Sequence, residues 1–123
     1  MPVQARQGAT PLLAAGSERQ FIAIAGVSGA QGTPRIDHGC FTIEGFHPDK
    51  MLRALADYGI KPRGSADGPP GPLVSYVSMR GEDRGGDRGG TPEVYFTDPD
   101  GILMQIQDVS YCGGSGYLGD VCG

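Results

Sequence analysis

The chain has 123 residues, a length typical of one domain, and its formal charge of -4 and isoelectric point of about 4.9 argue against binding driven by nucleic-acid phosphates. It contains 22 glycines and 10 prolines and is poor in large apolar side chains, so we expect a homodimer in which a second copy completes the core. No apolar run approaches the roughly 20 residues of a membrane helix, and residues 1–16 do not resemble a signal peptide. We therefore expect no membrane partner and take the cytoplasm as the default location.

Residues 1–34 predict a hairpin followed by a linker. Residues 1–8 are polar, and we expect them to lack regular structure. Residues 9–15 and 20–25 have the composition and alternation of strands, and the stretch between them is typical of a turn. Residues 26–34 are rich in glycine, serine and glutamine, which is typical of a flexible linker.

Residues 35–44 predict a strand with two different faces. His38 and Cys40 share one face, whereas Phe41 and Ile43 share the other. A helix is predicted next, because Pro48 suits a first helical position and an apolar stripe runs from residue 51 to residue 56, before Gly59. We expect this stripe to cover the apolar face of the strand.

The rest of the chain predicts three strands separated by loops. Residues 61–72 contain a Gly-Pro-Pro-Gly-Pro stretch and predict a loop, and residues 73–79 predict a strand. Residues 80–90 carry Arg-Gly-Gly pieces, but interleaved aspartates offset their charge, which favours a solvated hairpin loop over an RNA contact. Two alternating strands then flank a turn at Asp98-Pro99-Asp100-Gly101.

The last segment, residues 111–123, is a glycine-rich tail that holds two of the three cysteines. Cys112 and Cys122 are close enough in sequence to pair around a short loop, and they can equally stay as two free thiols in a reducing compartment. Both alternatives stay open from the sequence.

The order strand, helix, strand, strand, strand resembles the βαβββ module of the vicinal oxygen chelate superfamily. This superfamily includes glyoxalases, extradiol dioxygenases, fosfomycin-modifying enzymes and bleomycin-resistance proteins. The resemblance covers residues 35–108 and is carried by the Ile-Asp-His-Gly-Cys-Phe stretch at residues 36–41 and by the Tyr-Phe-Thr-Asp-Pro-Asp-Gly stretch at residues 95–101. It implies an α+β fold with a complete module over residues 35–110, preceded by a hairpin and linker, residues 1–34, left from an incomplete first module.

Carried over to this chain, the resemblance implies a metal site. His38 falls where the family has a first-strand ligand, and Gln105 falls where the family usually has glutamate. An amide oxygen binds a divalent cation less strongly than a carboxylate does. In a two-fold dimer, two His38 and two Gln105 side chains would together form a neutral four-group site for zinc, nickel, iron or manganese.

Four further residues are predicted to line a substrate pocket beside these two. Cys40 shares a strand face with His38, Glu93 and Tyr95 share a face of their own strand, and Gln107 shares a face with Gln105. Their alternative role is cross-strand packing, and the alternative for His38 is a hydrogen-bonded wall residue. No catalytic residue can be assigned.

Two functions follow from the resemblance. The first is a glyoxalase- or dioxygenase-like protein in which a divalent metal polarises a small oxygenated substrate, that is, a metal-dependent lyase or dioxygenase. The alternative is a metal-free protein of bleomycin-resistance type that binds or sequesters a small molecule and needs no cofactor. Fold resemblance alone supports the reaction class.

Overall fold

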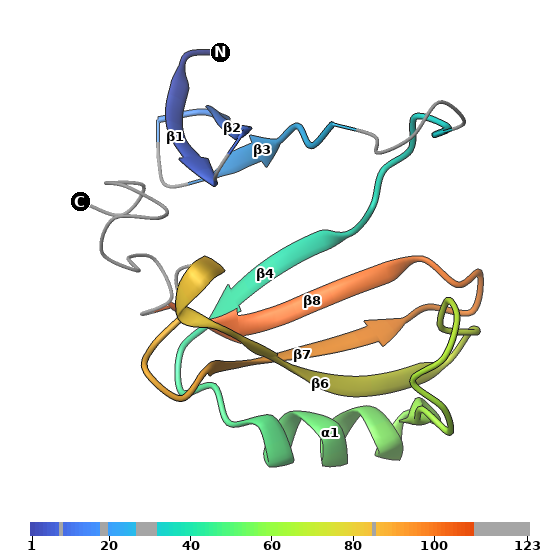
Figure 1. The fold of residues 1–123 in the computed structure, drawn as a ribbon. Coiled ribbons are helices and arrows are strands. Elements are labelled where there is room, and N and C mark those ends of the chain that lie inside the picture. The colour runs from blue at the N-terminus through green and yellow to red at the C-terminus, as the bar shows by residue number, and fades with distance from the viewer. Residues whose placement is uncertain (8, 18–19, 27–31, 85, 110–123) are drawn as a thin grey trace. The chain divides into compact units, whose positions relative to one another are not determined.

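The computed structural model describes residues 1–7, 9–17, 20–26, 32–84 and 86–109. These residues form an α+β fold with one helix, a three-stranded antiparallel sheet and a five-stranded mixed sheet (Figure 1). The chain divides into two compact units, one of which includes Met1–Arg35 and Gly81–Gly90 and the other Ile36–Arg80 and residues 91–109. Within this part of the chain, no helix is long and apolar enough to cross a lipid bilayer.

The first unit contains the three-stranded sheet, in which the strands are ordered as they occur in the chain. Its strands are β1 (Val3–Gln7), β2 (Thr10–Ala14) and β3 (Phe21–Ala23). The predicted hairpin is confirmed by β2 and β3, in which Leu13 lies opposite Ile22. The expectation of no regular structure in residues 1–8 was wrong, because β1 pairs with β2. A polar edge strand is held by its backbone ladder rather than by burial, so hydropathy alone did not indicate it.

The second unit contains the five-stranded sheet, which has the order β4-β8-β7-β6-β5. Strand β4 is parallel to β8, β5 is parallel to β6, and the other pairs are antiparallel. The predicted sequence of strand, helix and three strands is confirmed by β4, α1, β6, β7 and β8. The bounds are β4 (Gly39–Ile43), α1 (Pro48–Asp57), β5 (Lys61–Pro62), β6 (Val74–Arg80), β7 (Thr91–Thr97) and β8 (Leu103–Asp108).

Two differences from the predicted elements matter for the site. Strand β4 begins at Gly39, opposite Met104 of β8, so His38 lies just before the strand. Residues 61–72 are not entirely a loop, because Lys61 and Pro62 form the short strand β5 at the edge of the sheet. Proline is tolerated at a sheet edge, and two residues are too few to show a strand period in the sequence.

The turn between β7 and β8 has the predicted geometry. Gly101 has φ of +82°, a conformation that glycine adopts without a Cβ clash. The Asp98 Oδ1 atom accepts hydrogen bonds from the backbone N–H groups of Asp100 at 2.9 Å and Ile102 at 2.8 Å. This turn aligns β8 against β7 and so fixes which of their residues lie side by side.

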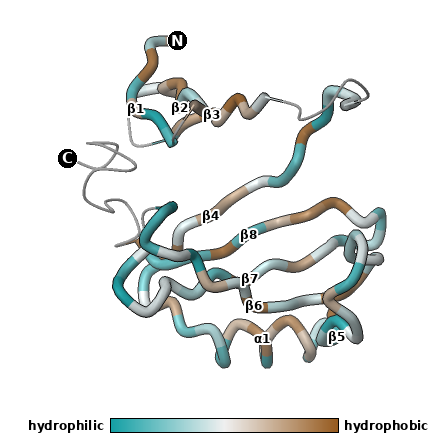
Figure 2. Tube along the Cα trace, in the orientation of Figure 1, coloured by the Kyte–Doolittle hydropathy of each residue, from teal (hydrophilic) through white to brown (hydrophobic). Residues whose placement is uncertain are grey.

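Helix α1 contacts β5, β6 and β7 on one face of the sheet, and Figure 1 shows it beneath β6 and β7. Hydrophobic and hydrophilic residues alternate along it, as expected for a helix that packs by one side (Figure 2). Val94, at the centre of β7, is fully buried. The prediction that the helix covers Phe41 was wrong, because this side chain is 55% exposed. A ten-residue helix is only about 15 Å long, and β4 lies two strands beyond β7.

The loop predicted between β6 and β7 is present as a hairpin connection that contains a short 3-10 turn, Glu82–Arg84. The predictions for residues 111–123, including the pairing of Cys112 and Cys122, lie outside the described residues.

Candidate functional site

The face of the five-stranded sheet opposite α1 carries a row of polar and aromatic side chains that crosses four strands. Cys40 of β4 lies opposite Gln105 of β8, Gln105 lies opposite Tyr95 of β7, and Tyr95 lies opposite Tyr76 of β6. Residues that are directly opposite one another in a sheet project from the same face. We call this surface the polar face.

A second row on the polar face lies two residues further along β4, β8 and β6, and two residues earlier in the antiparallel strand β7. Thr42 is opposite Gln107, and Ser78 is opposite Glu93. The Gln105 Nε2 atom donates a hydrogen bond of 2.8 Å to the Gln107 Oε1 atom. The two glutamines therefore form a pair between the two rows.

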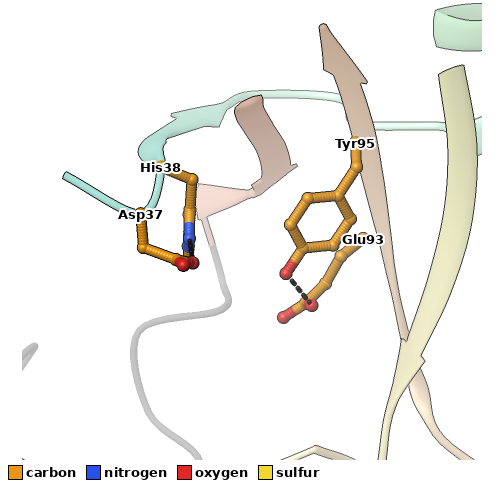
Figure 3. Close-up of polar contacts among 4 residues, drawn as sticks. All are labelled: Asp37, His38, Glu93 and Tyr95. Atoms are coloured by element: carbon orange, nitrogen blue, oxygen red, sulfur yellow. Dashed lines mark hydrogen bonds and ion pairs between the residues drawn. The ribbon is translucent and has the colours of Figure 1, made fainter. Parts of the chain in front are cut away.

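Four polar residues form a buried floor to the polar face. Each of these residues has only 4 to 5% of its surface exposed: Arg80, Glu93, Gln105 and Gln107. The Nε atom of Arg80 lies 3.4 Å from the Glu93 Oε1 atom, and the Tyr95 hydroxyl donates a hydrogen bond of 3.1 Å to the Glu93 Oε2 atom (Figure 3). Glu93 is thus held from two sides.

Burial raises the pKa of Tyr95 well above its usual value, and the nearby Glu93 carboxylate raises this pKa further. The phenol therefore stays protonated throughout the physiological range. It acts as a donor to Glu93, and this bond fixes the orientation of the ring.

An aromatic and cationic stack runs along the same face. The rings of Tyr76 and Tyr95 are nearly parallel, at 8°, with centroids 5.3 Å apart. The Arg63 guanidinium carbon lies 5.2 Å from the Tyr76 ring centroid, which is within the range of a cation–π contact. The Arg63 Nη2 atom also donates to the carbonyl oxygens of Ala66, at 3.1 Å, and Gly68, so the loop that follows β5 holds the guanidinium in place.

His38 lies at the other end of this stack. Its ring meets Tyr95 at an interplanar angle of 69°, with centroids 5.9 Å apart. The His38 Nδ1 atom is 2.8 Å from the Asp37 Oδ2 atom (Figure 3), and 33% of the His38 side chain is exposed. A carboxylate only accepts hydrogen bonds, so Asp37 places the proton on Nδ1 and leaves Nε2 as an acceptor in the neutral ring.

Cys40 is an exposed residue, but the protein around its thiol partly shields the sulfur from water. Desolvation, and then the Glu93 carboxylate, raise its pKa to about 11, while Arg80 acts in the opposite direction. The thiol is therefore neutral at pH 7. It can contact a ligand but is a poor nucleophile.

Five of the six residues that the sequence singled out lie on the polar face of the sheet, and the sixth, His38, lies just before β4. His38 contacts Tyr95, Tyr95 bonds to Glu93, and Cys40 lies beside the pair of glutamines. Sequence reasoning missed Arg63, Asp37, Tyr76 and Arg80. The sequence predicted a strand over residues 73–79, but no local pattern indicated that Arg63 would lie over the Tyr76 ring.

Comparison with known proteins gave no match to a protein-family model, to a curated protein or to a solved structure.

The polar face offers few donors for the predicted metal site. Among the described residues, no group of three or more His, Cys, Asp and Glu side chains is placed to hold a metal ion. The Gln105 amide is engaged with Gln107, and His38 is engaged with Asp37 through one ring nitrogen. An imidazole and an amide are too few ligands for a stable divalent site, so these residues do not fit a resident metal within one chain. The metal role of His38 and Gln105 stays a prediction.

Proposed function

We propose that residues 36–109 form a module of vicinal oxygen chelate type that binds a small oxygen-bearing molecule on its polar face without a metal of its own. The order of β4, α1, β6, β7 and β8 supports this, as does the adjacency of the first and last strands, which brings Cys40 beside Gln105. In this proposal the sheet of β1, β2 and β3 is the remnant of a preceding module. The protein acts as a binding or sequestering protein of bleomycin-resistance type.

The observation that carries the proposal is the buried polar floor. A sheet face that only meets water would leave its polar side chains hydrated, whereas Arg80, Glu93, Gln105 and Gln107 are almost fully buried. Burying an ion pair and two amides costs more than an apolar packing of the same volume. Such costs are typical of sites that recognise a ligand by its polar groups.

Accessible groups lie at one side of this floor and provide the contacts for a ligand. His38 offers a ring nitrogen as acceptor, and Cys40 offers a neutral thiol. Tyr95 is half-buried and offers the part of its side chain that stays exposed. None of these is an activated nucleophile. We therefore favour binding over catalysis for this chain.

The test is a screen for small oxygen-bearing ligands by ligand-observed NMR, using protein stripped with a chelating resin. We expect ligands to bind without metal and to bind with unchanged affinity after Zn²⁺ is added. Binding only in the presence of Zn²⁺ would support the metal-dependent alternative, and no binding in either condition would overturn the proposed function.

A pair of variants locates the bound ligands. Cys40→Trp places a large ring on the polar face and should weaken binding at least about tenfold, or by about 1.4 kcal/mol. Lys50→Trp is the control, because Lys50 is exposed and belongs to α1, which packs on the opposite face of the sheet. Equal effects of the two variants would place the ligand elsewhere.

A further inference from the structure

We propose that the outer edge of β3 pairs with β3 of a second copy of the chain, as antiparallel strands related by a two-fold axis at Ala23. The contact joins the three-stranded sheets of the two copies into one sheet of six strands. It belongs to the first unit and does not depend on the function proposed for the polar face.

The backbone of β3 presents hydrogen-bonding groups along its outer edge. The strand is the last in the order β1-β2-β3. The Ile24 N–H group donates to the Pro11 carbonyl oxygen at 3.1 Å, on the side of β2. Because hydrogen-bonded and non-hydrogen-bonded positions alternate along an antiparallel ladder, the backbone groups of Phe21 and Ala23 point away from β2. Within the described part of the chain, no hydrogen bond is made to these outward groups.

The side chains along this edge are apolar and exposed. Ile22 and Ile24 share one face and are 48% and 53% exposed, and Phe21 on the other face is 36% exposed. Residues 20–26 include no charged side chain. An apolar edge strand with outward N–H and carbonyl groups is a template for a further strand, because only an extended backbone matches the spacing of those groups.

The other sheet edges formed by the described strands carry features that hinder pairing. Strand β1 has an irregularity in its register between Val3 and Ala5. Strand β5 has two residues, one of which is Pro62, which has no N–H group to donate. Strand β4 is flanked by two carboxylates, those of Asp37 and Glu44. Bulges, proline and charge all protect an edge, and β3 has none of them.

The sequence of β3 is complementary to itself about Ala23, which is why the strand that fits is a second copy. An axis at Ala23 places Ile22 opposite the partner's Ile24 and Phe21 opposite the partner's Ala25. Two β-branched side chains then lie side by side, and a large ring meets a small side chain. No charge meets its own copy across the axis. Because such a contact is isologous, it uses both β3 edges and closes at the dimer.

Amide hydrogen exchange, followed by NMR over a range of protein concentrations, tests the contact in the unmodified chain. We expect exchange of the Phe21 and Ala23 N–H groups to slow at least about tenfold as the concentration rises, because the partner strand then accepts their hydrogen bonds. The Ile24 N–H group is the control. It is already bonded to β2, so its exchange should depend much less on concentration.

A charge exchange at Ala23 tests the partner and the position of the axis. Ala23→Lys and Ala23→Glu each place like charges opposite one another, and each should weaken the pairing at least about tenfold. Adding unlabelled Ala23→Glu protein to ¹⁵N-labelled Ala23→Lys protein should restore slow exchange at Phe21, because opposite charges then face each other. Ala23→Gln is the matched control for side-chain size and should keep the concentration dependence.

The outcomes separate the parts of the proposal. Exchange at Phe21 that is equally fast, or equally slow, at every concentration would overturn the pairing. Concentration-dependent exchange that persists in Ala23→Lys, or a mixture of the two folded charge variants that fails to restore slow exchange, would overturn the axis at Ala23. Circular dichroism checks that the variants fold, and the unmodified chain decides if they do not.

Discussion

At the scale of single residues, the amide at position 105 is explained by its neighbours. Glu93 already places one carboxylate in the buried floor, and Gln105 donates to Gln107 from its amide nitrogen. A glutamate at position 105 has no such donor and would add a second buried negative charge to the same face, where Arg80 is already paired with the first. An amide at this position therefore agrees with the proposed binding of a ligand without a metal.

The raised pKa of Cys40 predicts how the alkylation rate of its thiol depends on pH. Because the thiolate is the nucleophile and the pKa is about 11 rather than near 9, the alkylation rate of Cys40 by iodoacetamide should still rise between pH 9 and pH 11. The measurement is mass spectrometry of Cys40 alkylation over that range, in a Cys112→Ser, Cys122→Ser background.

The control is the same protein unfolded in urea, in which the Cys40 rate should level off near pH 9. A folded protein whose rate also levels off there would contradict the assigned environment of the thiol. The sign is fixed by desolvation and by Glu93, which both disfavour the thiolate.

At the scale of elements, the turn between β7 and β8 sets the alignment of the polar face. Two backbone N–H groups depend on one carboxylate oxygen of Asp98. Asp98→Ala removes both bonds, and we expect it to lower the free energy of unfolding by about 2 kcal/mol. Urea denaturation followed by circular dichroism measures this change.

Asp100→Ala is the matched control for this turn. Asp100 joins the turn through its backbone N–H, which the substitution keeps. We expect a change of less than about 0.5 kcal/mol, as for most surface positions. Similar losses in both variants would show that the carboxylate of Asp98 does not organise the turn.

At the scale of the whole molecule, apolar side chains stay exposed on the face of the five-stranded sheet that carries α1. Phe41 is 55% exposed and Met79 is 52% exposed, because α1 is too short to reach across the whole sheet. Exposed apolar surface of this kind is often covered by a partner. We expect a second copy of the chain to cover it, in agreement with the small apolar content of the sequence.

The predicted homodimer is tested by sedimentation equilibrium. Phe41→Ser should weaken dimerisation at least about tenfold, which corresponds to about 1.4 kcal/mol. Ile36→Ser is the control, because Ile36 is 90% exposed and precedes the strand, and we expect no change. A monomer at all concentrations would show that the homodimer prediction is wrong.

Local patterns determined much of the fold in advance. The alternation of polar and apolar residues separated Cys40 from Phe41, and the sequence of the turn anticipated the positive φ of Gly101. The helix was predicted from its first proline and its stripe. These features are readable because a strand repeats every two residues and a turn or a helix end depends on a few neighbouring residues.

The tertiary structure alone decided how these pieces meet. Parallel pairing of β4 with β8 places Cys40 beside Gln105, and the loop after β5 brings Arg63 over Tyr76. The burial of the Glu93 carboxylate was also not visible in the sequence, where it alternates like any solvated strand residue. Pairing and loss of hydration depend on contacts between residues far apart in the chain, whereas the period of a strand depends only on its neighbours.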